Sequence, residues 1–279
     1  MAARAENPHK PAPPPTARMT PKSPTGIKVI VIGAGFAGLG MAIECIRQGH
    51  EVEVFEQARQ FTTLGDLIVL TPNGSRIVSR WDDCLPRLMN HCLWVDRMNI
   101  LDRYGKQLHV QPWVREHDGF PFTMGQRSAY QEIFVGYAES LGIPVHMNSR
   151  VEQHFENETG AGIVVNGVTY HADVVIGTDG IHSRCRVHVT GREEEAQGSG
   201  YAVFRAWFNL DEVTDPLINE LRRGESEDSY DLWIGDDVHA FILTCPALNM
   251  VVYAFTHADT FNAKESYSHP GRIDDVLQS

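Results

Sequence analysis

The sequence lacks several motifs that would fix its chemistry at once. It contains no GxSxG, HExxH or CxxC motif, which are typical of serine hydrolases, zinc proteases and dithiol or zinc sites. Its five cysteines are an odd number without CxxC spacing, which predicts reduced thiols in a cytoplasmic protein rather than a disulfide framework. No run of about 18 apolar residues occurs, so the chain holds no candidate membrane span. We expect no metal site.

Basic side chains are also scarce. Lys and Arg total 24 against 36 Asp and Glu, which gives a net charge of -12. This balance argues against nucleic acid or an anionic membrane as partner and leaves small neutral or anionic ligands open. The hydrophobic content of 42% in 279 residues predicts a globular protein, as one large domain or two interleaved ones, with no signal for an oligomeric state.

The first 26 residues are rich in proline. They contain seven prolines and few side chains that could be buried, so the entropy lost on ordering would not be offset. We expect a disordered tail over 1–26. A transit peptide is the alternative, although the prolines between 11 and 15 forbid a helix there.

A glycine-rich turn follows the first apolar run. The run IKVIVIG at 27–33 is short and β-branched, which predicts a strand buried on both faces of a parallel sheet. A GxGxxG pattern comes next, and apolar spacing then predicts a helix that ends at Gly49. A second strand is expected over 51–56. The segment therefore predicts a complete βαβ unit.

The glycine pattern predicts a dinucleotide ligand with an ADP half. In such a unit Gly33 makes the tight turn, Gly35 lets a pyrophosphate approach the backbone, and Gly38 lets the helix pack against the strand. Glu56 ends the second strand, where a carboxylate can accept hydrogen bonds from a ribose diol. A tight turn without a ligand is the alternative. The cofactor-binding candidates here are Gly33, Gly35, Phe36, Ala37, Gly38, Glu56 and Gln57.

Two later segments are expected to reach the same ligand. Arg127 begins an amphipathic helical segment, where its guanidinium can reach a phosphate or ribose edge, with a plain surface arginine as the alternative. Asn166-Gly167 predicts a two-residue hairpin. The stretch VVIGTDG at 174–180 predicts a third parallel strand that delivers Asp179 to the ligand edge of the sheet, with capping of the following segment as the alternative.

Three motifs in this order resemble those of the FAD-dependent aromatic hydroxylases, the single-component flavin monooxygenases related to salicylate and 4-hydroxybenzoate hydroxylases. They are GxGxxG with Glu56, QRSAYQEI at 126–133, and a DGxxSxxR pattern at 179–186. The sequence is most similar to those of family members that act in fungal natural-product pathways. The resemblance covers nearly all of residues 27–260.

This resemblance implies an α/β fold in which a Rossmann-like FAD-binding domain is interleaved with a β-sheet substrate domain. It implies FAD as cofactor and NADPH or NADH as co-substrate. It implies hydroxylation or epoxidation, with O2, of a small aromatic or polyketide- or terpenoid-type substrate in secondary-metabolite biosynthesis. With the resemblance, the expected FAD site outside the glycine-rich unit consists of Arg127, Asp179, Gly180 and Ser183.

The resemblance also implies a substrate-holding sheet in the second half. Strands are expected over 200–210, 230–246 and 249–255. Arg205 matches an arginine that related hydroxylases place near the substrate, where a cation would stabilise a phenolate. Relatives often carry Tyr-Pro where this chain has Cys245-Pro246, so their substrate and regiochemistry are not carried over.

Other segments carry weaker expectations. The stretch 64–81 resembles the part of the family near the flavin ring, with Pro72-Asn73 opening a helix and the backbone of Gly65-Asp66-Leu67 against the isoalloxazine. Three further residues could line the pocket or pack in the core, namely Trp207, Trp233 and His239.

One family motif is missing. A GDAAH-like stretch is imitated by residues 235–239, but AFILTCP follows where glycines are needed, so we expect a turn of the sheet there. Family members continue beyond the position where this sequence ends. We therefore expect the chain to correspond to about the first two-thirds of a family member. The expected organisation is the tail over 1–26, an FAD-binding domain over 27–190 with a substrate-domain insertion around 91–120, and an incomplete substrate sheet over 191–279.

Two other functions stay open. An NAD(P)-dependent reductase of the short-chain dehydrogenase type suits the length, but it needs a Tyr-x-x-x-Lys pair, and none of the eight tyrosines has a lysine four positions on. A truncated flavoprotein with weak or no activity, acting as an accessory protein, is the third interpretation.

Overall fold

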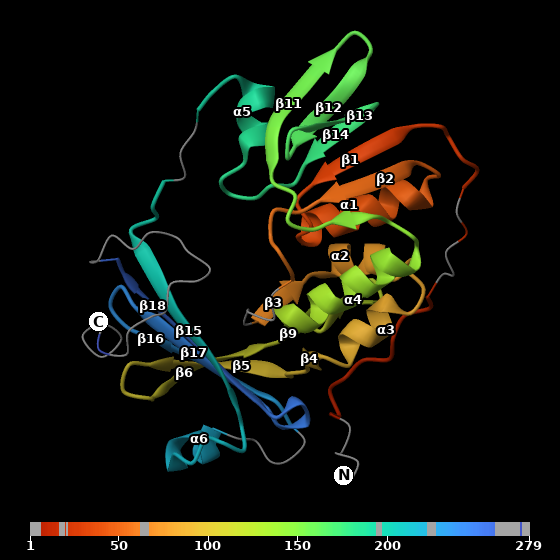
Figure 1. Cartoon of the computed structure of the whole chain (residues 1–279). Helices are drawn as coiled ribbons and strands as arrows, with labels where there is room; N and C mark the ends of the chain where they lie inside the picture. The colour runs from red at the N-terminus through yellow and green to blue at the C-terminus, as the bar shows by residue number, and fades with distance from the viewer. Residues whose placement is uncertain are drawn as a thin grey trace.

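Two sheet systems make up the protein (Figure 1). The computed structural model describes residues 7–16, 20, 22–61, 67–193, 197–221, 227–259 and 274. A parallel sheet with its helices forms one part, and a six-stranded sheet forms the other. This α/β arrangement is the fold class predicted from the sequence. None of the helices in the described ranges combines the length and the apolar character needed to cross a membrane.

The parallel sheet has the strand order β10-β2-β1-β14. Its middle strand β1 (Lys28–Ile32) pairs in parallel with β2 (Glu51–Phe55) and with β14 (Val174–Gly177), and β10 (Val145–His146) adds an edge. Helix α1 (Phe36–Arg47) connects β1 to β2. The βαβ unit and the third parallel strand are therefore confirmed.

Helices cover one face of this sheet. α4 (Arg127–Ser140) contacts α1 and α3 (Cys84–Met89), and α2 (Pro72–Val78) begins at Pro72 as predicted. Aromatic rings fill the space between them, with Trp81 edge-on to Phe134 at 5.1 Å between ring centroids. This core holds α1 against β1 and so fixes the glycine-rich turn between them.

A small antiparallel sheet lies beside β14 (Figure 1). It consists of β11 (Val151–Asn157), β12 (Gly160–Val165) and β13 (Val168–Ala172). Asn166 and Gly167 connect the last two strands with φ of 51° and 74°, so the predicted two-residue hairpin is confirmed. Helix α5 (Arg184–Thr190) follows β14.

The six-stranded sheet has the order β15-β18-β17-β16-β5-β6. Four strands come from the three regions predicted as strands in the second half, and the residues between Ile234 and His239 form the predicted turn. Two more come from the first half of the chain. The strands are β15 (Tyr201–Asn209), β18 (Met250–Ala258), β17 (His239–Cys245), β16 (Ser229–Ile234), β5 (Arg97–Asp102) and β6 (Gln107–Pro112).

Short elements connect the two parts. β9 (Thr123–Gln126) pairs with β3 (Leu67–Leu70) and β4 (Cys92–Leu93), and Leu93 and Met124 pack on Leu243 and Val252 of the six-stranded sheet. The remaining elements are β7 (Glu116–His117), β8 (Phe120–Pro121), α6 (Pro216–Leu221) and a 3-10 turn (Pro246–Leu248). An apolar contact thus joins one face of the large sheet to the parallel-sheet part.

Part of the expected disordered tail lies against the protein body, which corrects that expectation for residues 7–16. Asn7 is buried, and its side-chain amide donates to the carbonyl of Trp94 at 3.2 Å. Lys10 donates to Asn90 at the end of α3, and Arg115 donates to the carbonyl of His9. These hydrogen bonds offset part of the conformational entropy that residues 7–16 lose when they become ordered.

A buried carboxyl group lies beside this segment. Asp228 is 1% exposed, and it accepts the backbone N–H of Trp94 at 2.6 Å. Burial raises the pKa of Asp228 to about 6, and the hydrogen bonds from Trp94, Cys245 and Asn7 reduce this effect. Because its protonated form is favoured in the folded state, Asp228 stabilises the fold fully below the unfolded pKa and loses that contribution as pH rises through about 6.

We expect Asp228→Asn to be more stable than the parent at pH 7, by as much as about 3 kcal/mol, because the amide oxygen can still accept from Trp94 without a buried charge. Urea unfolding at several pH values measures this. The parent should lose stability relative to Asp228→Asn between about pH 4 and pH 6. Asp236→Asn, at an exposed carboxylate paired with Arg103, is the control and should keep the parent's pH profile. An identical profile in Asp228→Asn would contradict the assignment.

Candidate functional site

The ends of β1 and β14 meet at the glycine-rich turn. The Thr178 hydroxyl donates to the carbonyl oxygens of Ile32 at 2.7 Å and Gly33 at 2.9 Å, which ties the two strand ends together. Sequence reasoning missed this residue. The available signal was its place between Gly177 and Asp179, inside the motif that follows the third parallel strand.

Two glycines of the turn are required by the protein itself. A Cβ on Gly38 would lie 1.8 Å from the carbonyl oxygen of Gly33, and a Cβ on Gly33, where φ is 98°, would lie 2.6 Å from that of Thr178. Gly35 differs, because a Cβ there would meet nothing within 4 Å. Its backbone therefore faces open space, as the close approach of a ligand would require.

The open space lies at the start of α1. Gly35 is the N-cap residue and supplies no side-chain hydrogen bond, so Phe36, Ala37 and Gly38 present first-turn N–H groups that the cap does not satisfy. These groups and the positive end of the helix dipole favour an anion. The arrangement can hold a pyrophosphate.

Glu56 lies directly after β2 and beside the same turn. One carboxylate oxygen accepts the N–H of Ala34 at 2.8 Å, and the other accepts that of Ala58 at 2.7 Å. Glu56 is half-buried, and its neighbour Gln57 is exposed. The structure thus brings Glu56 to the glycine turn with its carboxylate held in one orientation.

Arg127 also reaches the turn. It is the first residue of α4, and its guanidinium carbon lies 5.5 Å from the centre of the Phe36 ring. Phe36 is itself packed edge-on against Phe134 of α4. A cation therefore lies over the first residue of α1, next to the anion-favouring helix start.

Asp179 caps α5. Its carboxylate accepts the Ser183 hydroxyl at 2.6 Å and the backbone N–H groups of Arg184 and Cys185 at 2.8 and 3.2 Å. Burial alone would raise the pKa of Asp179, but these hydrogen bonds hold it below its usual value. Ser183 is the N-cap residue of α5, and Gly180 has a φ of 80°. The capping role that the sequence left open is present in the structure.

A second contact fixes the segment that follows β14. The Cys185 thiol lies 3.1 Å from Nε2 of His154 on β11. Burial raises the pKa of Cys185 to about 12, and the charge of Asp179 adds to this. Burial likewise lowers the pKa of His154. Both groups are therefore neutral near pH 7, so the thiol positions the loop and is not a nucleophile.

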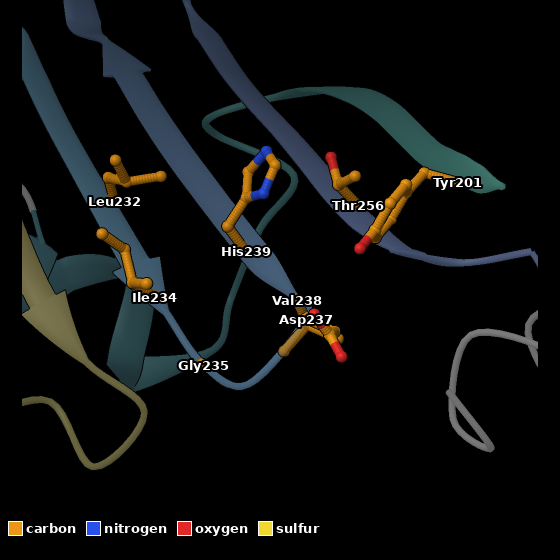
Figure 2. Close-up of a pocket in the computed structure, with 8 residues that line it drawn as sticks. All are labelled: Tyr201, Leu232, Ile234, Gly235, Asp237, Val238, His239 and Thr256. Carbon is orange, nitrogen blue, oxygen red and sulfur yellow. The ribbon is translucent and has the colours of Figure 1, made fainter. Parts of the chain in front are cut away.

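The six-stranded sheet carries a hollow of about 560 Å³ at the end farthest from its packed core. Figure 2 shows side chains of Leu232, Ile234, His239, Thr256 and Tyr201 around it. They come from four neighbouring strands. This volume lies within the range of small-molecule sites.

The sheet register places the other substrate candidates. Arg205 and Trp207 alternate with Tyr201 along β15, so they belong to the face of the hollow, and both are exposed. Trp233 lies between Leu232 and Ile234 and therefore points to the opposite face. Cys245 is fully buried beside Asp228 and does not line the hollow.

The segment expected near a flavin ring is only partly described. Gly65 and Asp66 lie outside the described residues, while Leu67 begins β3. Within the described ranges, no group of three histidine, cysteine or acidic residues could hold a metal ion.

Comparison with known proteins agrees with this geometry. The profile of the NAD(P)-binding Rossmann-like domain family matches residues 31–67, which include the glycine turn and Glu56. Asperlicin C monooxygenase of Petromyces alliaceus is 34% identical over 250 residues, which are 86% of this chain and 52% of that protein. The FAD-dependent monooxygenase nodY2 of Hypoxylon pulicicidum is 32% identical over 91% of this chain and 59% of its own length.

Solved structures are similar as well. The crystal structure of CtdE in complex with FAD and a substrate superimposes with a TM-score of 0.84 at 29% identity, covering 90% of this chain and 62% of CtdE. FqzB gives a TM-score of 0.79 at 32% identity, covering 93% of this chain and 60% of FqzB. The chain thus spans about half to three-fifths of the length of these relatives. Over the part that it spans, the chain is similar in sequence and in fold to FAD-dependent monooxygenases.

Proposed function

We propose that this protein is an FAD-dependent monooxygenase that hydroxylates or epoxidises a small aromatic or polyketide- or terpenoid-type substrate with NADPH or NADH and O2. The observation that carries the proposal is the open approach to Gly35 between two sterically obligatory glycines. The curated relatives named above are monooxygenases of fungi, and CtdE binds FAD in its crystal structure, which supports the same cofactor here. Secondary-metabolite biosynthesis in the cytoplasm is the setting that we infer.

Three groups of residues in this chain would each bind a different part of FAD. The N–H groups of Phe36, Ala37 and Gly38 would bind the pyrophosphate, helped by the Arg127 cation. The Glu56 carboxylate, held by two backbone N–H groups, would accept the ribose diol. The loop at Asp179 and Gly180, ordered by the Ser183 cap, would close the site from the β14 side.

The six-stranded sheet would hold the substrate, together with the excursion of residues 91–120 that supplies β5 and β6. We propose the domain division at residues 190 and 191 on this basis. When bound, the flavin supplies hydride acceptance and oxygen transfer, so no protein nucleophile is needed. Arg205 lies on the face of the hollow, where its cation would stabilise negative charge on the substrate ring.

The proposal is tested on the purified chain. We expect about one FAD per chain, visible by its absorbance at about 450 nm, and NADPH or NADH oxidation under air that an aromatic substrate stimulates. A colourless protein that binds no added FAD but turns over a nicotinamide cofactor would support the reductase instead. A chain that stays folded but carries no FAD and shows no NAD(P)H oxidation under air would support the accessory protein.

Two glycine variants separate ligand binding from folding. We expect Gly35→Ala to stay within about 1 kcal/mol of the parent in stability, because its Cβ meets no protein atom, yet to weaken FAD binding at least about tenfold. Gly38→Ala should cost about 3 kcal/mol or more, because its Cβ overlaps the Gly33 carbonyl. Urea unfolding without FAD and fluorescence titration with FAD measure the two effects. Unchanged FAD affinity in Gly35→Ala would show that no pyrophosphate lies there.

A further inference from the structure

The wall of the hollow in the six-stranded sheet is largely apolar, with a pair of polar side chains on neighbouring strands and Asp237 in the turn at its rim. His239 of β17 and Thr256 of β18 are direct cross-strand partners in the antiparallel pair. In Figure 2 both side chains stand on the same side of the sheet, between Leu232 and Ile234 on one flank and Tyr201 on the other. Directly opposed residues have Cβ atoms about 5 Å apart, so one ligand edge can reach both.

Neither polar side chain has a partner within the part of the chain that the structure describes. Among the interactions of the described residues, no hydrogen bond or ion pair involves the side chain of His239 or of Thr256. Other histidines have partners: His146 bonds to Glu53, and His154 contacts Cys185. An imidazole offers one donor and one acceptor, and a hydroxyl offers both, so the pair can satisfy a ligand edge that carries a donor beside an acceptor.

The flanks of the hollow determine the rest of the ligand. Leu232 and Ile234 lie two positions apart on the same face of β16 and present branched aliphatic carbons, and Tyr201 adds a ring across the hollow. These surfaces favour a flat, apolar body rather than a polar or sugar-like one. The volume of about 560 Å³ accommodates a ring system of at least two fused rings.

We propose that His239, assisted by Thr256, is the specificity-determining residue of this sheet and that it selects fused-ring ligands whose edge pairs a hydrogen-bond donor with an acceptor, as in a lactam. The inference rests on the proposed function in that the ligand would be the monooxygenase substrate. His239 acts by binding the substrate edge and orienting the ring over the sheet.

The test uses two probes that differ by one donor. 2-Quinolone has a lactam N–H beside its carbonyl, and 1-methyl-2-quinolone has the donor blocked. We expect the parent chain to bind 2-quinolone roughly three- to tenfold more tightly by isothermal titration calorimetry, which is the scale of one hydrogen bond in a half-exposed site. His239→Phe should bring the ratio of the two affinities close to one, and His239→Gln, whose amide keeps a donor and an acceptor, should retain most of it.

A matched control has the same substitution on the same sheet. His109 of β6 is exposed and lies outside the hollow, so His109→Phe should keep the parent's preference. Because His239 is exposed, its replacement should leave the thermal unfolding temperature near that of the parent. An affinity ratio of one in the parent, or an unchanged ratio in His239→Phe, would overturn the inference.

FAD content is measured on the same samples, so that the two proposals can fail separately. A preference for 2-quinolone that depends on His239 in a chain that binds no FAD would uphold the binding site and overturn the monooxygenase. Bound FAD together with an affinity ratio that ignores His239 would uphold the monooxygenase and overturn the role of His239.

Discussion

The close crossing of two strand ends is the constraint on which the nucleotide-type site depends. Thr178 at the end of β14 bonds to carbonyls at the end of β1, and the backbones approach so closely that Gly33 has no room for a Cβ. Gly38 then lets α1 begin within contact of the same turn. Once these three residues are in place, the N–H groups of α1, Glu56 after β2 and the Asp179 loop after β14 necessarily share one edge of the sheet.

The local parts of this arrangement could be predicted from the sequence. A βαβ unit is specified by apolar runs and glycines within about thirty residues, and the Asn166-Gly167 hairpin requires only two positive φ angles. The turn after Ile234 could be separated from a nucleotide loop because β-forming residues follow it. In each case the information lies within a few residues of the element that it determines.

The contacts between distant segments could not be predicted. The position of Thr178 inside the motif after the third parallel strand marks it as a residue near the ligand edge, but the sequence does not show that its hydroxyl bonds to a carbonyl 145 positions earlier. The order of residues 7–16 depends on the Trp94 and His9 carbonyls finding donors in Asn7 and Arg115, which composition does not reveal. Likewise, the face of the sheet to which His239 and Trp233 point follows from the register between β16 and β17. A shift of either strand by one residue would turn its side chains to the opposite face.

Asp179 shows how a residue proposed to meet a ligand can also be required by the fold. A carboxylate that accepts from Ser183, Arg184 and Cys185 is fully engaged with α5, so it has no need of a ligand for its own stability. The same bonds hold the backbone of Gly180 at a φ of 80°, where the loop turns past the glycine-rich edge. Capping therefore does not compete with the proposed cofactor binding, because the cap keeps the loop in the shape that a bound dinucleotide would meet.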